Sequence, residues 1–313
     1  MEPKPVIEAI PYLSTHSIAI DVLRLDQIHP VVSGNKWYKL RYYIQAALES
    51  NTNTIASFGG PYSNHLVALA YAAKEHGLKS KGYVRSNAGE AVTPTLQEAI
   101  TYGMELIFLG RTSFLEKKTT LLSHHIIEAS KTYYVDEGGY GELGAKGACT
   151  IISDWDPLNN RNILSAYTND LSKNPIHAYD YIICAVGTGT MIAGILNAAL
   201  KHQCIIGIPV LKNEGTIKDE ILNLLKDKQI RFELLHTFHQ GGYAKTTPAQ
   251  IEFINRFWVN TKIPTDIVYT GKVFYAVEQL MQQNYFKPNT KVLIIHSGGL
   301  QGNRSLAEDV LLF

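Results

Sequence analysis

Short runs rich in apolar and β-branched residues alternate with longer helical patterns along most of this chain. Parallel strands need crossover connections of about that length, so the alternation predicts an α/β fold with parallel sheets and right-handed crossovers. Strands are expected at residues 54–60, 79–85, 104–109, 132–135, 179–186, 204–211, 231–237 and 291–295. Helices are expected at residues 61–76, 93–102, 113–130, 191–200, 216–227, 247–259 and 273–283.

The stretch 153–174 interrupts this alternation with Asp, Asn and Pro residues and little periodicity. We interpret it as a connection between two structural units. One α/β unit is expected near residues 43–145, and the rest of the chain is expected to form the other. The sequence contains no internal repeat and no low-complexity tract.

The composition is typical of a globular protein with a large core. Hydrophobic residues make up 45% of the 313 residues and charged residues 18%, a balance that is not found in disordered chains. The 29 basic and 28 acidic residues give a formal net charge of +1. This charge gives no reason to expect nucleic acid or an anionic membrane as a partner.

The cysteines and the N-terminal residues indicate a reducing compartment. Cys149, Cys184 and Cys204 lie in or near apolar runs and have no CxxC spacing, which is typical of buried thiols rather than of a disulfide framework. The first residues include three prolines and no long apolar stretch. Neither a signal peptide nor a membrane helix is expected there, and a cytoplasmic location is predicted.

Residues 31–48, VVSGNKWYKLRYYIQAAL, read as a loop that runs into a helix whose apolar period starts at Leu40. Lys36, Lys39 and Arg41 crowd its first turn, although the positive end of a helix dipole disfavours cations. A bound anion would offset this cost. Neighbouring cations also lower the pKa of an amine and favour a lysine that forms a Schiff base. The alternative is an exposed structural lysine.

The strongest anion signal is YDYIICAVGTGTMIAGIL at residues 179–196. A strand runs into Gly187-Thr188-Gly189-Thr190 and then into a helix, an arrangement that binds phosphate through backbone N–H groups. It is not a dinucleotide fingerprint, because the third glycine position is Ile192 and the expected ribose-binding acid is replaced by Ile208 and Pro209. A single phosphate is therefore favoured over NAD or ATP. A plain tight turn is the alternative.

A second candidate ligand position lies at residues 57–77, SFGGPYSNHLVALAYAAKEHG. After the predicted strand and the double glycine, Ser63 and Asn64 fall near a helix N-terminus at the carboxyl end of a strand, the usual ligand position in open α/β sheets. Capping of the helix by either residue is the alternative. No G-x-S-x-G elbow is present, so Ser63 is not an α/β-hydrolase nucleophile.

Weaker signals follow toward the C-terminus. Residues 265–272 and 293–302 end apolar runs with small polar residues, and Tyr243 lies in a glycine-rich loop. Each is weak alone, because loops routinely contain Gly and Tyr. No metal site is predicted, because the histidines lack metal-ligand spacing: His65, His124, His125, His236, His239 and His296.

Together these motifs resemble the 1-aminocyclopropane-1-carboxylate deaminase / D-cysteine desulfhydrase family of pyridoxal-phosphate enzymes. The most specific pieces are Gly34-Asn35-Lys36 with Lys39, and Tyr62-Ser63-Asn64-His65 after the double glycine. The resemblance runs from Gly34 to Gly302. It implies the tryptophan synthase β-like fold, fold type II, with two three-layer α/β domains and mainly parallel sheets. Residues 43–145 would form the small domain, and residues 1–42 and 146–313 the large cofactor-binding domain.

The resemblance assigns roles to individual residues. Lys36 would form the Schiff base with pyridoxal phosphate, and Lys39 with the turn from Gly187 to Thr190 would hold its phosphate. Asn64 would bond the 3′-oxygen of the ring. Ser63 would bind the substrate carboxylate or act as nucleophile or proton relay. Three further residues would surround the substrate in this family: His65, Tyr243 and Tyr269.

Two positions bear on the choice of substrate. The deaminases carry Glu after the second tyrosine and Leu after the histidine of the final strand, whereas this chain has Thr270 and Ser297. A carboxylate beside the pyridine nitrogen keeps the ring a strong electron sink, while a hydroxyl leaves it weaker. A weaker sink suffices when a good leaving group departs from Cβ. Tyr38 replaces the Arg that is usual in the family.

The sequence thus predicts a lyase that catalyses α,β-elimination on a small β-substituted amino acid. D-cysteine is the expected substrate, with pyruvate, ammonia and hydrogen sulfide as products. The alternatives are a 1-aminocyclopropane-1-carboxylate deaminase, another amino-acid racemase or dehydratase, and a non-catalytic α/β module that binds a phosphorylated metabolite. Family analogy suggests a homodimer.

Overall fold

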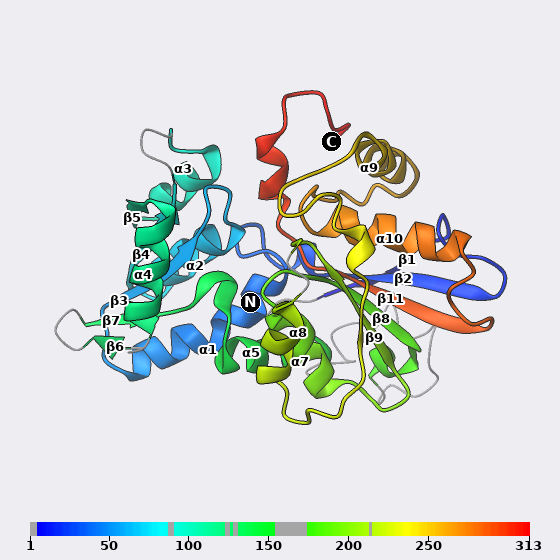
Figure 1. Ribbon diagram of the computed structural model, residues 1–313, viewed down its shortest axis with the longest axis horizontal. Coiled ribbons are helices and arrows are strands. Elements are labelled where there is room, and N and C mark those ends of the chain that lie inside the picture. The colour runs from blue at the N-terminus through cyan, green and yellow to red at the C-terminus, as the bar shows by residue number, and fades with distance from the viewer. Residues whose placement is uncertain (1–4, 87–90, 123–125, 128–130, 154–173, 213–214) are drawn as a thin grey trace.

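The strands fall into two separate sheets, one on each side of the molecule (Figure 1). The computed structural model describes residues 5–86, 91–122, 126–127, 131–153, 174–212 and 215–313. None of the helices in this part of the chain combines the length and apolar character that crossing a membrane requires.

The larger sheet combines strands from both ends of the chain. Its order is β1-β2-β11-β8-β9-β10, and neighbours are parallel except for β1 with β2. The strands are β1 (Ile7–Ala9), β2 (Ile18–Arg24), β11 (Thr290–His296), β8 (Tyr181–Val186), β9 (Cys204–Pro209) and β10 (Glu233–Leu234).

Helices cover both faces of the larger sheet. Successive side chains of a strand point to opposite faces, and in β11 Leu293 and Ile295 pack on one side while Val292 and Ile294 pack on the other. The first side is covered by α5 (Glu142–Ser153), α7 (Thr190–Ala198) and α8 (Ile217–Asn223). The second is covered by α9 (Pro248–Thr261) and α10 (Thr270–Gln282).

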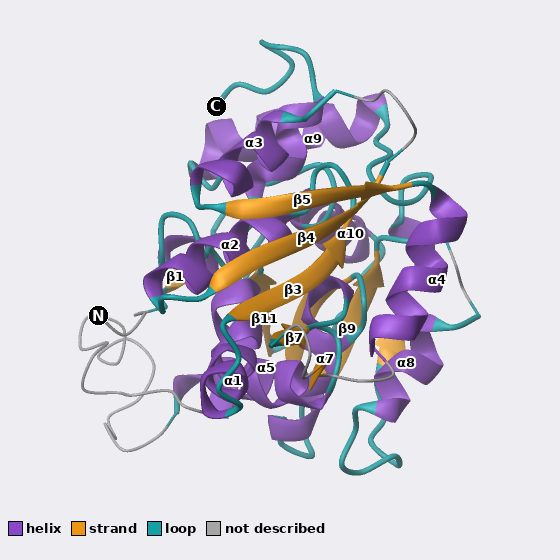
Figure 2. Cartoon of the chain, turned by 90° about the vertical axis from the view of Figure 1, so that its left-hand side faces the viewer, coloured by secondary structure: helices purple, strands orange, loops and turns teal. Residues whose placement is uncertain are grey.

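The smaller sheet is also sandwiched between helices, as Figure 2 shows. Buried Ile55 packs toward the helices on one face, and buried Phe58 packs toward α4 on the other. The order is β5 (Met104–Leu109), β4 (Lys79–Arg85), β3 (Thr54–Gly59), β7 (Thr132–Tyr134) and β6 (Ile126–Ile127), with only β6 antiparallel to its neighbour. The helices are α1 (Asn35–Glu49), α2 (Asn64–Glu75) and α3 (Pro94–Thr101) on the first face and α4 (Arg111–Leu122) on the second.

Helix α1 joins the two halves because it also packs against α5. At Gly147 of α5 an added Cβ would lie 2.0 Å from the carbonyl oxygen of Tyr38, and at Gly194 of α7 it would lie 2.5 Å from the Cβ of Ala148. Only glycine allows backbones to approach so closely. Short 3₁₀ helices complete the fold: η1 (Leu25–Gln27), η3 (Glu137–Gly139), η5 (Pro175–Ala178), η6 (His236–Phe238) and η7 (Leu300–Ser305).

The predicted α/β class with mainly parallel sheets is confirmed. The predicted strands all occur, most of them within two residues of their expected ends. The domain boundaries at residues 42 and 145 stay a prediction, although the strands of the smaller sheet all lie within residues 54–134. Most of the predicted connection at residues 153–174 lies outside the described residues.

Other expectations need correction. The helix predicted over residues 113–130 ends at Leu122, and Ile126–Ile127 forms β6 beside β7 because β-branched residues fit a sheet. Helix α1 begins at Asn35, so Lys36 lies in its first turn as predicted. Strands β1 and β2 and helix α5 were not predicted. Helix α5 contains glycines, which weaken its helical pattern in the sequence. Strand β2 is stabilised by pairing with β11, which comes from the far end of the chain.

Candidate active site

One cavity of about 470 Å³ lies at the carboxyl ends of strands from both sheets. This is the usual ligand position in parallel α/β folds. Its walls come from the starts of α1, α2 and α7, from the turn after β11 and from the loops that carry Tyr243 and Tyr269. The predicted site residues that line it are Lys36, Lys39, Ser63, Asn64, His65, Gly187, Thr188, Gly189, Tyr243, Tyr269 and Ser297.

Lys36 lies in the first turn of α1, and a backbone contact fixes that turn. Gly34 has a φ of 67°, an added Cβ there would lie 1.7 Å from the carbonyl oxygen of Ser297, and the N–H of Asn35 donates to that oxygen at 3.0 Å. The amine of Lys36 donates to Asn35 Oδ1 at 2.8 Å. Burial lowers the pKa of Lys36 to about 8, partly opposed by Asp266. This increases the neutral, nucleophilic fraction of the amine.

Lys39 lies one turn farther along α1, with only 4% of its surface exposed. Its amine donates to the carbonyl oxygen of Gly138 at 3.3 Å. Burial and the neighbouring Lys36 hold the pKa of Lys39 well below its usual range. Arg41 does not line the cavity and instead packs toward α5, where it donates to Thr150. The predicted cationic turn therefore presents two of its three basic side chains to the cavity, and a bound anion would stabilise their charged forms.

The turn before α7 lines the same cavity as the two lysines. Gly189 is the N-cap of α7 with a φ of 80°, in the left-handed region that favours glycine. The first N–H groups of a helix have no partner within it and can bind an anion. Thr190 does not line the cavity; it is fully buried, and its Oγ1 lies 3.0 Å from Oγ1 of Thr188.

The start of α2 supplies the opposite wall. Ser63 caps the helix by accepting a hydrogen bond from the N–H of Leu66 at 3.3 Å, as the capping alternative predicts. The same residue also lines the cavity. Asn64 donates through Nδ2 to the carbonyl oxygen of Gly299 at 3.0 Å. Among the described residues, Asn64 Oδ1 is buried and has no hydrogen-bond partner. A ligand is the natural partner for such an atom.

His65 is buried beside Asn64, and one of its two ring nitrogens has a hydrogen-bond partner. Its Nε2 lies 2.8 Å from Oγ of Ser57, whereas Nδ1 has no partner within the described part of the chain. Burial, Lys36 and Lys39 hold the pKa of His65 well below its usual range. The imidazole is therefore neutral at physiological pH.

Tyr243 and Tyr269 form a pair in the wall of the cavity. Their ring centroids are 6.2 Å apart, and the planes are inclined at 72°. Burial raises the pKa of both hydroxyls. Both tyrosines are thus protonated at neutral pH and can donate a proton.

Thr270, predicted to contact the cofactor, does not line the cavity. Its hydroxyl donates to Asp266 Oδ1 at 2.6 Å and accepts from the N–H of Asp266 at 2.8 Å. Ser297 does line the cavity, in the turn after β11. Of the two hydroxyl positions predicted to influence the substrate, only Ser297 reaches the cavity directly.

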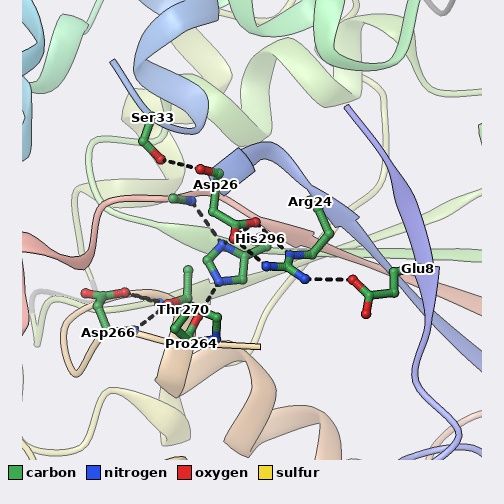
Figure 3. A network of polar contacts seen from close by, with 9 residues as sticks. Glu8, Arg24, Asp26, Ser33, Pro264, Asp266, Thr270 and His296 are labelled. Carbon is green, nitrogen blue, oxygen red and sulfur yellow. Dashed lines mark hydrogen bonds and ion pairs between the residues drawn. The ribbon is translucent and has the colours of Figure 1, made fainter. Parts of the chain in front are cut away.

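A buried network that was not predicted supports this turn (Figure 3). His296 Nε2 donates to the carbonyl oxygen of Pro264 at 2.7 Å, and its Nδ1 lies 3.4 Å from Asp26 Oδ1. Arg24 binds Asp26 through two hydrogen bonds of 2.9 and 2.7 Å and binds Glu8 at 2.6 Å. Although burial opposes it, His296 and Arg24 lower the pKa of Asp26.

Charged residues at the cavity wall were also missed. Arg85 ends β4, and Lys118 of α4 binds the carboxylate of Asp136 at 2.7 Å. Glu137 lies 3.8 Å from Lys118. The position of Arg85 and Asp136, at or just after the carboxyl end of a strand, is the signal that could have identified them.

The comparisons with known proteins agree with this geometry. Residues 5–298 match the family model described as pyridoxal-phosphate dependent enzyme. A Thermotoga maritima protein named "Putative 1-aminocyclopropane-1-carboxylate deaminase" is 28% identical over 96% of this chain and 95% of its own. The mitochondrial bifunctional D-cysteine desulfhydrase/1-aminocyclopropane-1-carboxylate deaminase of Arabidopsis thaliana is 26% identical over 87% of this chain and 70% of its own.

Among solved structures, the crystal structure of an ACC deaminase homologue superposes with a TM-score of 0.78 at 24% identity, covering 96% of this chain and 90% of that one. This likeness shows the fold, and it confirms the predicted fold type II. The predicted resemblance and the predicted cofactor are confirmed as well. Because the match extends over most of its length, the chain belongs to the family of pyridoxal-phosphate dependent enzymes.

Proposed function

We propose that this enzyme catalyses α,β-elimination on a small β-substituted amino acid, with D-cysteine as its substrate and pyruvate, ammonia and hydrogen sulfide as products. The main support is the chemistry of positions 270 and 297, which carry hydroxyl side chains in this chain. Position 270 cannot supply a carboxylate to the pyridine nitrogen, so the electron sink is expected to be weak. Such a sink suits the departure of a thiolate from Cβ better than the opening of a cyclopropane ring.

The cavity fits pyridoxal phosphate. Lys39, the N–H groups of the turn from Gly187 to Thr190 and the positive end of α7 would hold the phosphate. Lys36 would hold the cofactor covalently through its amine. The unpartnered Asn64 Oδ1 marks a polar contact that the protein itself leaves open, on the residue predicted to bond the 3′-oxygen of the ring. When bound, the cofactor supplies the electron sink for charge that develops at Cα.

The remaining residues would bind the substrate and move protons. Ser63 and the first N–H groups of α2 would bind the substrate carboxylate. Lys36, with its pKa lowered to about 8, can take the proton from Cα. Tyr243 and Tyr269 keep their protons at neutral pH and can donate one to the leaving sulfur. A homodimer and a cytoplasmic location remain predictions.

A substrate panel tests the proposal. Purified enzyme is assayed with D-cysteine, L-cysteine, β-chloroalanine, D-serine and 1-aminocyclopropane-1-carboxylate, and the keto-acid products are identified. D-cysteine should give pyruvate and sulfide, with a higher kcat/KM than L-cysteine, D-serine or 1-aminocyclopropane-1-carboxylate. The Lys36→Ala variant serves as the control for slow reactions of free cofactor with thiols.

A 1-aminocyclopropane-1-carboxylate deaminase is the second candidate, favoured by the names of the two relatives. Faster release of 2-oxobutyrate from aminocyclopropane carboxylate than of pyruvate from D-cysteine would establish it and refute the first proposal. Turnover of neither compound, with activity on D-serine alone, would indicate a dehydratase.

A further inference from the structure

Two buried charged residues lie just outside the cavity and have no assigned contact with the cofactor or the substrate. Asp266 and Lys272 are both 0% exposed, and neither lines the cavity. Buried charges are retained only where hydrogen bonds and an opposite charge stabilise them. The partners of these two residues connect them to the tyrosine pair.

Asp266 holds the backbone of Tyr269. Its Oδ2 accepts hydrogen bonds from the N–H groups of Val268 and Tyr269, each at 2.9 Å. Its Oδ1 accepts from the N–H of Thr270 at 2.7 Å and from the hydroxyl of Thr270 at 2.6 Å. The carboxylate thus satisfies the free donors at the start of α10 and fixes the residue from which the Tyr269 ring projects.

Lys272 holds the loop of Tyr243. Its amine donates to the carbonyl oxygen of His239 at 2.8 Å and to that of Gly242 at 2.7 Å. The loop turns at Gly241 and Gly242, whose φ values of 93° and 113° favour glycine. The second of these carbonyl groups belongs to the residue directly before Tyr243.

The two charges also act on each other. Burial lowers the pKa of Lys272 to about 8, and Asp266 opposes this decrease. Burial raises the pKa of Asp266, and its hydrogen bonds to Thr270 and to the backbone oppose that increase. Each charge therefore helps to keep the other ionised in the protein interior.

We propose that Lys272, with Asp266 as its counter-charge, is a positioning residue that sets Tyr243 against Tyr269 from behind the cavity wall. Asp266 fixes one tyrosine through its own backbone, and Lys272 fixes the other through the loop backbone. Together the two anchors would hold the rings at their centroid separation of 6.2 Å. The link to catalysis rests on the proposed function, in which both tyrosines contact the substrate.

The first test measures amide hydrogen exchange in the substrate-free Lys272→Met variant. The carbonyl groups of His239 and Gly242 lose the ammonium donor and keep only a backbone N–H donor each, so exchange in residues 239–246 should accelerate by about tenfold or more. Exchange in α2, on the other side of the cavity, should not change. The matched control is Lys201→Met, at a lysine that is exposed. Unchanged exchange in the loop would overturn the proposal.

The second test is a double-mutant cycle of Lys272→Met with Tyr243→Phe. Misplacement of a contacting group by about 1 Å costs about 100-fold in rate, so Lys272→Met should lower kcat/KM by that order. If Lys272 acts through Tyr243, the kcat/KM of the double variant should be at most about threefold lower than that of the worse single variant. A double variant whose loss of kcat/KM equals the product of the two single losses would refute the proposal. Should Lys272→Met fail to fold, Lys272→Gln, which keeps an amide donor, replaces it in both tests.

The tests separate this proposal from the choice of substrate. The exchange experiment uses no substrate, and the cycle uses whichever compound of the panel the enzyme converts. If the enzyme does not convert D-cysteine but Lys272→Met accelerates hydrogen exchange in the loop, only the proposed function fails. If D-cysteine is converted and the cycle is additive, only the positioning role fails.

Discussion

Replacing Lys36 with alanine should abolish turnover, lowering kcat/KM by about 10³-fold or more. The variant loses both the amine that would attach the cofactor and the group placed to take the proton from Cα. It should also lose the visible absorbance of the protein-bound cofactor. The fold should persist, because among the residues that the structure describes the Lys36 side chain hydrogen-bonds only to the neighbouring Asn35. Steady-state kinetics, absorbance spectra and circular dichroism measure the three effects.

The matched control for this experiment is Lys201→Ala, at an exposed lysine outside the cavity. It should keep normal kinetics and spectra. A Lys36→Ala enzyme that retains bound-cofactor absorbance and more than about a tenth of its activity would show that another lysine holds the cofactor.

Replacing Gly34 with alanine should have the largest effect on stability. The new Cβ would lie 1.7 Å from the carbonyl oxygen of Ser297, and the φ of 67° disfavours any residue with a side chain. Either α1 or the turn after β11 must move, and both line the cavity. We expect a decrease of about 3–5 kcal/mol in the free energy of unfolding, or about 5–8 °C in Tm. Thermal unfolding and cofactor retention provide the measurements.

Gly110→Ala is the control for the glycine experiment. Gly110 is exposed, its φ lies outside the left-handed region, and an added Cβ would have no neighbour within 4 Å. Its Tm should change by less than about 2 °C. A Gly34→Ala protein as stable as this control would mean that the contact between α1 and the turn after β11 is not as close as described.

Most of the strands could be predicted from local sequence, whereas some helices could not. Buried strands such as β8 and β11 are short apolar runs with turn residues at their ends, so their positions are visible without knowledge of their partners. Helix α5 was missed because Gly144 and Gly147, which normally weaken a helix, allow close contact with neighbouring backbone. That reason exists only in the folded protein.

The candidate site shows the same division. Lys36, Lys39 and the turn from Gly187 to Thr190 could be recognised because cations at a helix start and glycines before a helix are local patterns. Asp266 and Lys272 could not, because their partners lie on a loop and a helix start whose proximity is a tertiary property. Thr270 was assigned by analogy alone, and its contact with Asp266 could not be anticipated.

The most direct measurement of the central claim is to map the lysine that reacts with pyridoxal phosphate. The purified protein is incubated with the cofactor, reduced with borohydride and digested, and the modified peptide is identified by mass spectrometry. Because the pKa of Lys36 is lowered to about 8, the rate of attachment should rise with pH and level off above pH 8. An amine with that pKa is about one-tenth neutral at pH 7, roughly 300-fold more than an ordinary lysine. We expect a single pyridoxyl group on Lys36 with this pH dependence. A label on another lysine, or a midpoint near pH 10.5, would show that Lys36 is not the residue that holds the cofactor.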